Sequence, residues 1–559
     1  MITNQHPDVL EKISSGIEGF DEITGGGLPR GRTTLLMGGP GCGKTVFALQ
    51  ALVSGATRHD APGIFVALEE NANRVQANAE SFGWDIDELQ KKHLYFLNAH
   101  LSPDVVKAGT FDLTALLATL EAKAHEMDAK LVAFDALDVL LSLLDNSAAE
   151  RRELYRIQDW LTRTGLTGIL TTKVEEKTSP NANHYGFMPF MADCVVLMRQ
   201  RVLDRVTMRE MRVLKYRGSA HGLNEVPFII GMAGIEVGAT NGVHPEPQPF
   251  TERISTGIAR LDEMLNGGIY RGTNTLLTGS AGTGKSTLAG LFVEAACRRG
   301  ERALFVSFDE NARDIVRDIA SVGVELAPHL KSGLLRMEAV RTEAAASEDH
   351  FIRIKNLIRE HQPKCLAIDP LSALVKVGGE LAARNAAERL IYLCRNERIT
   401  VYFTSLLEGK DADLETTPLH VSTLADTWIQ ISYALQGGER NRSLSIIKSR
   451  GSKHSNQMRE LVFSDNGITL ADPYTAGGEV LMGTLRIEKE KAVGAEHERL
   501  SHEIERLTRA RMTGLDGVGL RQDTAVRERD SKLVRAQRGD GKPAAGKLRA
   551  RSKARIKRP

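Results

Sequence analysis

Two glycine-rich stretches of the sequence each end in a lysine followed by a hydroxyl residue. One runs GGPGCGKT from Gly38 to Thr45, and the other runs GSAGTGKS from Gly279 to Ser286. Glycines let a loop wrap so that its backbone N–H groups point inward at phosphate oxygens, and the lysine adds a positive charge. The hydroxyl suits Mg²⁺. The stretches therefore predict two sites for ATP and Mg²⁺, formed by Gly38, Gly41, Gly43, Lys44 and Thr45 and by Gly279, Gly282, Thr283, Gly284, Lys285 and Ser286.

An aspartate ends an apolar run downstream of each glycine-rich stretch. Asp135 ends the run LVAFD, and Asp369 ends the run CLAID. A carboxylate at the end of a buried strand beside such a loop would hold Mg²⁺ through water. The alternative is an ordinary aspartate in a turn at the end of a strand. Because the two acids occupy matched positions, we expect the magnesium role for both.

A further pair of acids follows another apolar run in each half of the chain. Glu69 and Glu70 come after GIFVAL, and Asp309 and Glu310 come after ALFVSF. Acids at the carboxyl end of a parallel strand face the ligand crevice, where one of them could orient or deprotonate an attacking nucleophile. The alternative is a pair of solvated loop acids. Their recurrence in both halves favours the catalytic interpretation.

A basic segment closes each half of the chain. It reads KYRGSAH from Lys215 to His221 and KSRGSKH from Lys448 to His454. A lysine and an arginine this close together can neutralise phosphate charge, and an arginine from a neighbouring subunit stabilises the charge that develops in phosphoryl transfer. The alternative is a basic turn on the surface. The repeat favours a functional role.

These motifs recur in one order because the chain contains a duplicated domain. ISSGIEGFDEITGGG begins at Ile13, and ISTGIARLDEMLNGG begins at Ile254. Short apolar runs such as TTLLMG, NTLLTG and TGILTT are typical of buried strands. The residues after Lys44 and Lys285, the lysines of the two glycine-rich loops (P-loops), have helical spacing. Alternation of such strands and helices predicts an α/β fold in which each domain is a mostly parallel twisted sheet flanked by helices.

Composition shifts mark the expected boundaries. The stretch GATNGVHPEPQPF is rich in Gly and Pro and reads as a linker between a first domain at 1–240 and a second at 241–485. Residues 486–515 have helical spacing, with Leu500, Ile504 and Leu507 on one face, and both a short coiled coil and a solvated single helix fit this pattern. Residues 516–559 form a basic tail that we expect to be disordered, with at most weak contact to nucleic acid.

Bulk composition excludes several classes of protein. The 559 residues carry a formal net charge of +2, so the charge balance indicates no strongly charged partner. None of the five cysteines lies in a CxxC pair, and scattered thiols fit a reducing compartment. The first residues lack the pattern of a signal peptide, and no apolar run reaches the roughly 18 residues of a membrane span. We therefore expect a cytoplasmic protein without a membrane segment.

Taken together, these motifs resemble the KaiC family of RecA-like ATPases. The resemblance covers roughly residues 10 to 475 and rests on the start ISTGIxxLDE, the paired acids and the closing KxRGSxH. It implies two tandem RecA-like P-loop domains in a homohexamer with ATP between subunits. It also implies slow ATP hydrolysis in the first domain and an autokinase and autophosphatase in the second.

The resemblance implies roles for further residues. His420 to Thr423 reads HVST and matches the family's HxST segment, so Ser422 and Thr423 are the predicted phosphorylation sites. Without the resemblance, the alternative is that these polar residues lie at the start of a secondary-structure element, where Ser and Thr commonly cap helices. The metal-site residues become Thr45, Asp135, Ser286, Asp309 and Asp369. Contacts to ATP are implied for Ser81, Lys215, Tyr216, Arg217, Ser219 and His221 in the first domain and for Arg442, Lys448, Ser449, Arg450, Ser452 and His454 in the second.

The sequence departs from the clock-type pattern at several positions. Asp309 stands where that pattern has Glu, Val322 stands where it has an aromatic residue, and Asn456 stands where it has Lys. The tail does not match the regulator-binding peptide, so a KaiA-like activator is not expected, whereas a KaiB-like or two-component signalling partner is. Two alternatives remain: an ATP-driven hexameric switch without kinase activity, and a RecA-like nucleic-acid motor, for which no DNA-binding loop is recognisable.

Overall fold

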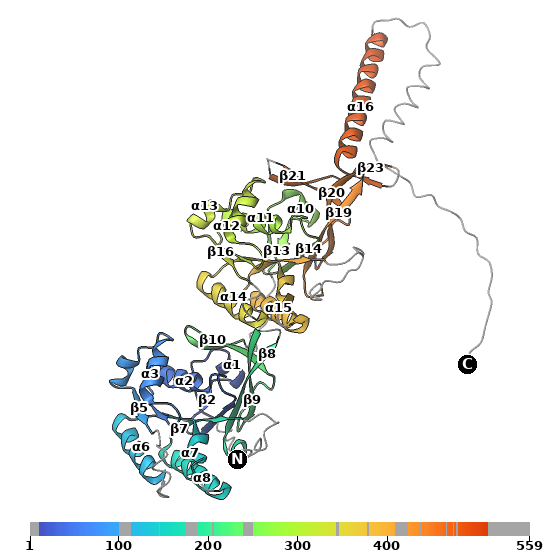
Figure 1. The fold of residues 1–559 in the computed structure, drawn as a ribbon. Helices are drawn as coiled ribbons and strands as arrows, with labels where there is room; N and C mark the ends of the chain where they lie inside the picture. Colours follow the sequence, from blue (N-terminus) through green and yellow to red (C-terminus); the bar gives the residue numbers. More distant parts are fainter. Residues whose placement is uncertain are drawn as a thin grey trace, which may run out of the picture. The chain divides into compact units, whose positions relative to one another are not determined.

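A nine-stranded sheet forms the centre of each half of the chain in the computed structural model (Figure 1). The chain divides into Met1–Val480, which contains both sheets, and Leu481–Pro559. Two tandem domains of the expected α/β type are therefore confirmed. The residues that the structure describes are 10–99, 113–144, 146–174, 187–203, 206–238, 250–341, 346–376, 379–407, 423–436, 438–464, 467–472, 474–476 and 479–512.

The first sheet has the strand order β11-β10-β9-β8-β3-β7-β6-β4-β5. From β8 to β5 all neighbours are parallel, whereas β9, β10 and β11 extend the sheet as an antiparallel edge. The strands of this domain are β1 (Lys12–Ile13), β2 (Leu28–Pro29), β3 (Thr33–Gly38), β4 (Gly63–Ala67), β5 (Leu94–Asn98), β6 (Leu131–Asp135), β7 (Thr167–Lys173), β8 (Cys194–Leu203), β9 (Val206–Tyr216), β10 (Val226–Gly231) and β11 (Gly234–Val237).

Helices cover both faces of the first sheet. The helix that follows the P-loop, α2, packs with α3 and α4 in one core, and α6, α7 and α8 pack in the core on the other face (Figure 1). The helices described here are α1 (Phe20–Thr24), α2 (Lys44–Arg58), α3 (Ala72–Glu80), α4 (Ile86–Gln90), α6 (Leu113–Met127), α7 (Leu137–Leu141), α8 (Ser147–Thr164) and α9 (Met188–Met191).

The second sheet repeats this topology with the order β16-β15-β17-β18-β14-β19-β20-β21-β22. Its antiparallel edge consists of β20, β21 and β22. The strands from the second half are β12 (Arg253–Ile254), β13 (Ile269–Tyr270), β14 (Asn274–Gly279), β15 (Ala303–Ser307), β16 (Leu335–Ala339), β17 (Cys365–Asp369), β18 (Thr400–Leu406), β19 (Thr427–Gln436), β20 (Glu439–Ser449), β21 (Arg459–Ser464), β22 (Gly467–Ala471), β23 (Tyr474–Ala476) and β24 (Glu479–Leu481).

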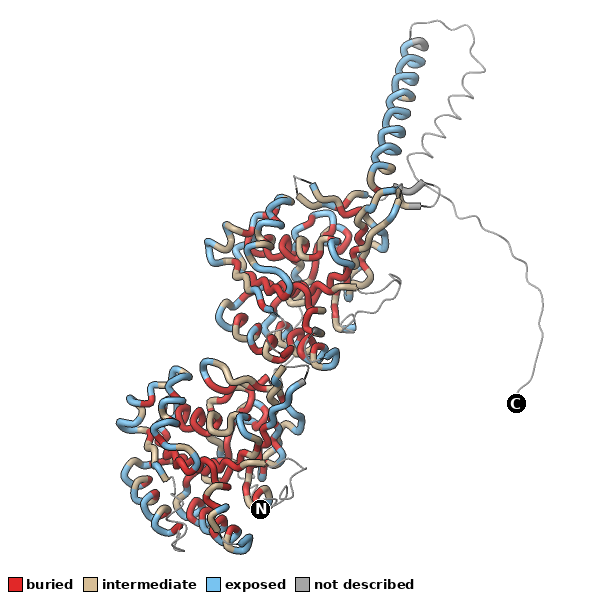
Figure 2. Tube along the Cα trace, viewed as in Figure 1, coloured by how far each residue is buried: buried red, intermediate tan, exposed pale blue. Residues whose placement is uncertain are grey.

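The second domain also has a core on each face of its sheet. The core on one face includes α11 and α12, and the core on the other includes α14 and α15. Figure 2 shows buried residues concentrated in the strands and in the helix faces against them. The helices are α10 (Ala259–Met264), α11 (Lys285–Arg298), α12 (Ala312–Ala320), α13 (Ala327–Lys331), α14 (Ser347–His361), the 3₁₀ helix η2 (Leu371–Lys376) and α15 (Gly379–Asn396).

Buried aliphatic and aromatic side chains explain why these segments form strands and helices. Every residue of β4 and of β6 is buried, as expected for central parallel strands covered on both faces. In α2, Phe47 is fully buried and meets the edge of Phe20 at a centroid distance of 4.9 Å. In the second domain, Phe292 of α11 stacks on Tyr402 of β18 at 4.3 Å. The helix after each P-loop is thus packed against its sheet.

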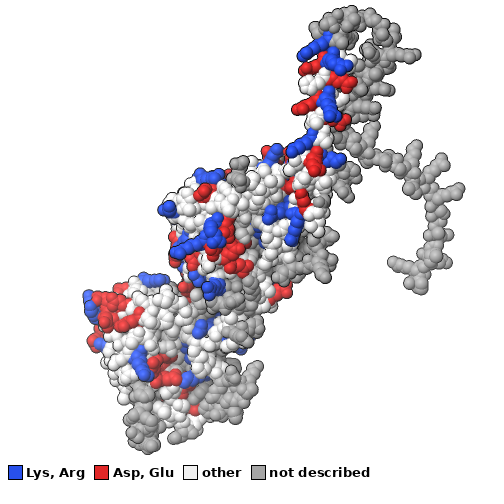
Figure 3. All heavy atoms as spheres, turned by 45° about the horizontal axis from the view of Figure 1, so that its top comes forward, with Lys and Arg blue, Asp and Glu red and all other residues white. Residues whose placement is uncertain are grey.

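The separate unit contains one long helix, α16 (Gly483–Met512). Ile487, Val493, Ile504 and Leu507 are each more than a third exposed, and Figure 3 shows Lys and Arg interspersed with Asp and Glu along the helix. The predicted helix is therefore present, while self-association stays a prediction. The basic tail at 516–559 lies outside the described residues. Among the residues that the structure describes, no helix is long and apolar enough to cross a membrane.

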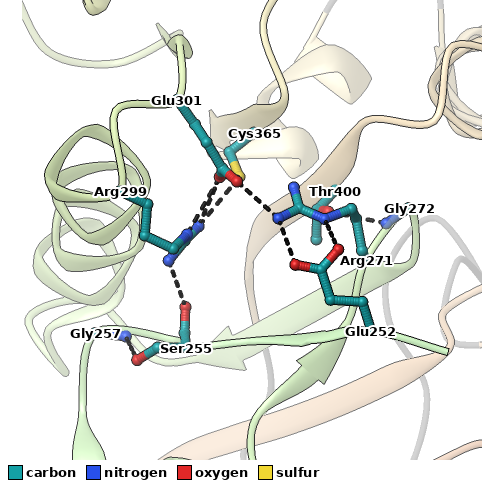
Figure 4. Close-up of polar contacts among 9 residues, drawn as sticks. All are labelled: Glu252, Ser255, Gly257, Arg271, Gly272, Arg299, Glu301, Cys365 and Thr400. Atoms are coloured by element: carbon teal, nitrogen blue, oxygen red, sulfur yellow. Dashed lines mark hydrogen bonds and ion pairs between the residues drawn. The ribbon is translucent and has the colours of Figure 1, made fainter. Parts of the chain in front are cut away.

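A charged network ties together the starts of the strands in the second sheet (Figure 4). Arg271, in the turn before β14, donates to both carboxylate oxygens of Glu252 at 2.7 and 3.0 Å and to Glu301 at 2.7 Å. Arg299 donates to Glu301 at 3.0 Å. Burial alone would raise the pKa of Glu301, but the two arginines bring it below its usual value. Cys365 lies beside this network, and burial raises the pKa of its thiol to about 12.

The buried P-loop strand gives a direct test of this packing. Leu277 of β14 is fully buried, so Leu277→Ala should lower the free energy of unfolding of the second domain by about 2–5 kcal/mol. Leu435 of β19, in the same sheet, is 80% exposed, so Leu435→Ala should change it by less than about 0.5 kcal/mol. Urea unfolding followed by the fluorescence of Trp428 measures both. Equal losses in the two variants would contradict the assigned core.

Candidate active sites

The first glycine of each P-loop occupies a position where no side chain would fit. A Cβ on Gly38, at the end of β3, would lie 2.3 Å from the carbonyl oxygen of Met198 in β8. A Cβ on Gly279, at the end of β14, would lie 2.4 Å from the carbonyl oxygen of Ile431 in β19. Both distances are far inside van der Waals contact. The loop leaves its sheet correctly only because the residue is glycine.

The last glycine of each P-loop has a second restriction. Gly43 has φ of 96° and Gly284 has φ of 101°, in the left-handed region that favours glycine. A Cβ on Gly43 would lie 2.8 Å from Ile230 Cδ1, and one on Gly284 would lie 2.4 Å from Phe463 Cζ. These neighbours come from the antiparallel edge of each sheet. The edge strands therefore press on the start of the helix that follows the P-loop.

The P-loop lysines point back into their own loops. Lys44 Nζ donates to the carbonyl oxygens of Gly38 at 2.8 Å and Gly39 at 2.9 Å. Lys285 Nζ does the same to Gly279 at 2.9 Å and Ser280 at 2.8 Å. Burial lowers the pKa of Lys285. Each ammonium is thus held by two backbone carbonyl oxygens of its loop, beside the N-terminus of the following helix. This arrangement fits nucleotide phosphates.

A hydroxyl and a carboxylate meet beside the first P-loop. Thr45 donates to Asp135 Oδ2 at 2.7 Å, and Thr171 of β7 donates to Asp135 Oδ1 at 2.5 Å. Burial raises the pKa of Asp135, against these hydrogen bonds, which lower it. Carboxylate and hydroxyl oxygens are hard ligands, and Mg²⁺ in nucleotide sites needs one or two carboxylates besides phosphates and water. The donor set therefore fits Mg²⁺.

The second domain repeats this arrangement. Ser286 and Thr404 of β18 both donate to the carboxylate of Asp369. Burial raises the pKa of Asp369 as it does for its counterpart. Among the described residues, no group of three or more His, Cys, Asp or Glu side chains could hold a metal ion by itself. At this site Ser286 and Asp369 would hold a magnesium ion together with nucleotide phosphates and water.

The predicted catalytic acids lie next to these carboxylates. β4 and β6 are neighbours, and the backbone N–H of Glu69 donates to the Asp135 carbonyl oxygen at 3.3 Å. Glu70 follows and is partly exposed. In the second domain, Asp309 and Glu310 follow β15, which pairs with β17. Each acid pair therefore lies at the same carboxyl edge of the sheet as its P-loop.

The electrostatic surroundings of the two acid pairs differ. Lys173 of β7 forms an ion pair with Glu69, and this hydrogen bond raises the pKa of Lys173. In the second domain, burial raises the pKa of Glu310, and the nearby acids, Asp369 first, raise it further. The first site thus carries an extra cation, whereas the second concentrates negative charge.

The closing basic segments do not surround the P-loop of their own domain. Tyr216 pairs with Cys194 at the start of β8, and β8 runs parallel to β3. The segment therefore lies at the amino edge of the sheet, opposite the P-loop. Lys215 Nζ donates there to the carbonyl oxygen of Ala192 at 2.6 Å, and Arg217 Nη2 donates to that of Phe190 at 2.8 Å.

The second domain uses the same anchoring on the predicted phosphorylation segment. Arg450 Nη2 donates to the carbonyl oxygen of Thr423 at 2.6 Å, and Lys448 Nζ lies 3.5 Å from the same oxygen. Burial lowers the pKa of Lys448, and the neighbouring Arg450 lowers it further. Thr423 is exposed just before β19, whereas Ser422 lies outside the described residues. The lysine, the arginine and the exposed threonine therefore form one surface.

Both halves of the chain match the same protein family. The sequence profile described as "ATPase: KaiC" matches residues 13–242 and again residues 254–474. This chain belongs to the KaiC family of ATPases. Both of its domains are KaiC ATPase domains of the RecA-like fold, so each contains an ATP-binding P-loop.

Individual relatives extend over most of the chain. A "Circadian clock protein KaiC2" of Synechocystis sp. is 39% identical over 494 residues, which cover 88% of this chain and 86% of that protein. A "Circadian clock oscillator protein KaiC" of Parathermosynechococcus lividus is 35% identical over 477 residues, covering 85% and 88%. One of the same description from Rippkaea orientalis is 36% identical over 477 residues, covering 85% and 91%.

The remaining residues that the KaiC resemblance singles out fall into two groups. Near their own P-loops are Arg442, whose Nη2 donates to the Gly282 carbonyl oxygen at 3.4 Å, and Thr283, whose hydroxyl donates to the Ser280 carbonyl oxygen at 2.9 Å. Outside both groups is Ser81, the residue after α3, whose hydroxyl donates to the carbonyl oxygen of Asn78 in that helix at 2.6 Å. The others lie in the closing segments, namely Tyr216, Ser219 and His221 in the first domain and Ser449, Ser452 and His454 in the second.

Four residues of the KaiC sites were missed by sequence reasoning. Thr171 and Thr404 donate hydrogen bonds to the predicted magnesium acids, Asp135 and Asp369. Lys173 and Asp138 flank the first acid pair. A threonine within a buried strand looks like any other β-branched strand residue. Its position one strand away from the acid becomes informative only when the order of strands is known.

The restriction on Gly284 predicts a selective defect in the second KaiC domain. Gly284→Ala should weaken Mg²⁺–ATP binding there by at least about tenfold, because the added methyl meets Phe463 and the left-handed backbone is strained. Gly300 has φ of 79° with open space around it, so Gly300→Ala is the matched control for backbone strain alone. Nucleotide titration in a Lys44→Ala background measures this. Equal weakening in both variants would refute the steric cause.

Proposed function

We propose that this chain is a KaiC-type ATP hydrolase and serine/threonine autokinase and autophosphatase, acting as a circadian-clock or signalling timer with Mg²⁺ as cofactor. ATP bound in the first domain is hydrolysed with Glu69 and Glu70 as the catalytic acids. ATP bound in the second domain phosphorylates Ser422 and Thr423, with Asp309 and Glu310 in the corresponding roles. The relatives named for the circadian clock support the timer role.

The observation that carries this proposal is that Lys448 and Arg450 contact the backbone carbonyl oxygen of Thr423, which places this basic pair next to the predicted acceptor residue. An arginine and a lysine beside an acceptor hydroxyl stabilise the charge on a transferring phosphoryl group. In the first domain the matching arginine, Arg217, donates to the carbonyl oxygen of Phe190, a residue that has no hydroxyl group. The contrast supports hydrolysis in one domain and self-phosphorylation in the other.

The donor and acceptor sites are too far apart for transfer within one chain. Thr423 lies before the start of β19, and the P-loop follows the end of β14, which runs parallel beside it. The strand between them spans roughly 15–20 Å at about 3.3 Å per residue. Reacting atoms must approach within about 3–3.5 Å. The phosphate must therefore come from a neighbouring subunit, and a homohexamer with ATP between subunits meets this need.

The two alternatives predict different behaviour. A hexameric switch without kinase activity would hydrolyse ATP and bind signalling partners but leave Ser422 and Thr423 unmodified. A nucleic-acid motor would need a continuous basic surface. In the view of Figure 3, basic and acidic side chains are interspersed over the described surface, which does not favour it.

Self-phosphorylation is tested with γ-labelled ATP. The unmodified chain should become labelled, whereas Ser422→Ala/Thr423→Ala should not, because it lacks the acceptor hydroxyls. Lys285→Ala should also remain unlabelled, because its second P-loop has lost the phosphate-binding ammonium. Absence of label on the unmodified chain would rule out self-phosphorylation, and ATP hydrolysis by that chain would leave the switch interpretation standing.

A mixture of the two inactive variants tests transfer between subunits. The acceptor-deficient chain still has an intact second P-loop, and Lys285→Ala still has both hydroxyls. If transfer crosses between subunits, mixing them should place label on the Lys285→Ala chain. Label on the unmodified chain without complementation in mixed, assembled hexamers would show that transfer occurs within one chain.

Assembly is tested by measuring mass with and without nucleotide. With saturating Mg²⁺–ATP we expect a species near six times the 61.2 kDa chain, because ATP would be held between subunits. Lys44→Ala/Lys285→Ala should not assemble. A monomer at saturating ATP, by light scattering or native mass spectrometry, would refute the hexamer.

A further inference from the structure

One matched position beside the catalytic acids carries a charge in the first domain only. Lys173 is the last residue of β7 and lies opposite Gly38 of β3. Leu406 is the last residue of β18 and lies opposite Gly279 of β14. The two residues therefore occupy the same point of the duplicated sheet. Each is a direct neighbour of the strand that leads into its P-loop.

The side chain that accepts a hydrogen bond from the backbone at this position also differs between the two domains. The backbone N–H of Lys173 donates to Asp138 Oδ1 at 3.1 Å. The backbone N–H of Leu406 donates to Ser372 Oγ at the same distance, 3.1 Å. The hydrogen bond is thus retained while both side chains lose their charge in the second domain. A lysine and an aspartate have been exchanged together for a leucine and a serine.

The lysine side chain reaches the first catalytic acid. Lys173 Nζ forms an ion pair with Glu69 Oε1, and the two side chains are 40% and 46% exposed. The hydrogen bond with Glu69 raises the pKa of Lys173, so the ammonium stays charged at neutral pH. In the second domain, burial raises the pKa of Glu310, and the neighbouring acids, Asp369 first, raise it further.

An ion pair of this kind restrains a general base. In hydrolysis, a water oxygen bonds to the γ-phosphorus, the bond to the β–γ bridging oxygen breaks with its electrons leaving on ADP, and a water proton passes to Glu69. A carboxylate that already accepts a hydrogen bond from an ammonium has one oxygen occupied, and its side chain is held in one orientation.

We propose that Lys173 is a positioning residue that restrains Glu69 and thereby slows ATP hydrolysis by the first domain. This inference rests on the proposed hydrolytic function of that domain. The second domain carries the uncharged Leu406 at the same point, so no ammonium is presented from this position. The exchange gives the duplicated sites different rates while leaving their P-loops and magnesium residues alike.

The test compares variants of the full chain in a Lys285→Ala background, which confines hydrolysis to the first domain. Lys173→Met keeps the aliphatic stem without the charge and should raise kcat by about threefold or more, with KM for ATP within about twofold. Lys173→Arg restores the cation and should return kcat to within about twofold of the parent. Lys91→Met removes an ammonium that pairs with Glu88 elsewhere in the domain and should change neither constant.

The results distinguish a failure of the proposed Lys173 restraint from a failure of the proposed ATP hydrolysis by the first domain. If the Lys285→Ala parent does not hydrolyse ATP, the proposed first-domain activity fails and the inference fails with it. If the parent hydrolyses ATP but Lys173→Met leaves kcat unchanged or lower, only the restraint is overturned. A rise in kcat that Lys173→Arg does not reverse would also overturn it, because the effect would then not depend on charge.

A transplant into the second domain provides an independent arm. Leu406 is partly buried at the carboxyl end of β18, so a longer side chain can reach solvent there. In a Lys44→Ala background, Leu406→Lys should slow labelling from γ-labelled ATP by about threefold or more, whereas Leu406→Met should not. Equal rates in the two variants would overturn a restraint that acts through charge at this position.

Discussion

The closeness of each P-loop to its own sheet is the constraint on which both domains depend. Gly38 and Gly279 lie against the carbonyls of Met198 and Ile431, with no space for a Cβ. This contact fixes where the loop leaves the strand, and therefore where the lysine and the following helix begin. The position of the phosphates relative to the buried magnesium acids follows from it. A shift of the loop would separate groups that must act within hydrogen-bond distance.

The sheet also separates the parts of each complete site. The P-loop, the magnesium acid and the acid pair lie at the carboxyl edge, while Lys448, Arg450 and Thr423 lie at the amino edge. A single chain therefore presents a donor on one edge and an acceptor surface on the other. Under the proposed function, phosphoryl transfer between these edges would need a second subunit, because the length of a strand separates them. Assembly and activity would then depend on the same nucleotide.

Duplication has produced two domains that share topology but not electrostatics. The strand order, the P-loop glycines and the threonine beside each magnesium acid are the same in both. The difference lies at the ends of β7 and β18. Lys173 forms an ion pair with Glu69 in the first domain, and Leu406 occupies the position of Lys173 in the second. Changes of this kind alter the reactivity of a carboxylate without disturbing the packing beneath it. Under the proposed restraint of Glu69, this exchange of charge would give the two domains different rates of phosphoryl chemistry.

The sequence by itself determined the features that depend on neighbouring residues. Both P-loops, the buried strands, the α/β class and the duplication follow from glycine positions and apolar runs. The family comparison confirms the duplicated domain, and the structure contains the strands. Only the tertiary structure decided which side chains meet across the sheet. Thr171 lies 36 residues after Asp135, and Lys173 lies 104 residues after Glu69, yet each pair is in contact. The antiparallel edge that presses on Gly43 and Gly284 was equally invisible. Such contacts depend on the order of strands in the sheet, which local residue patterns do not encode.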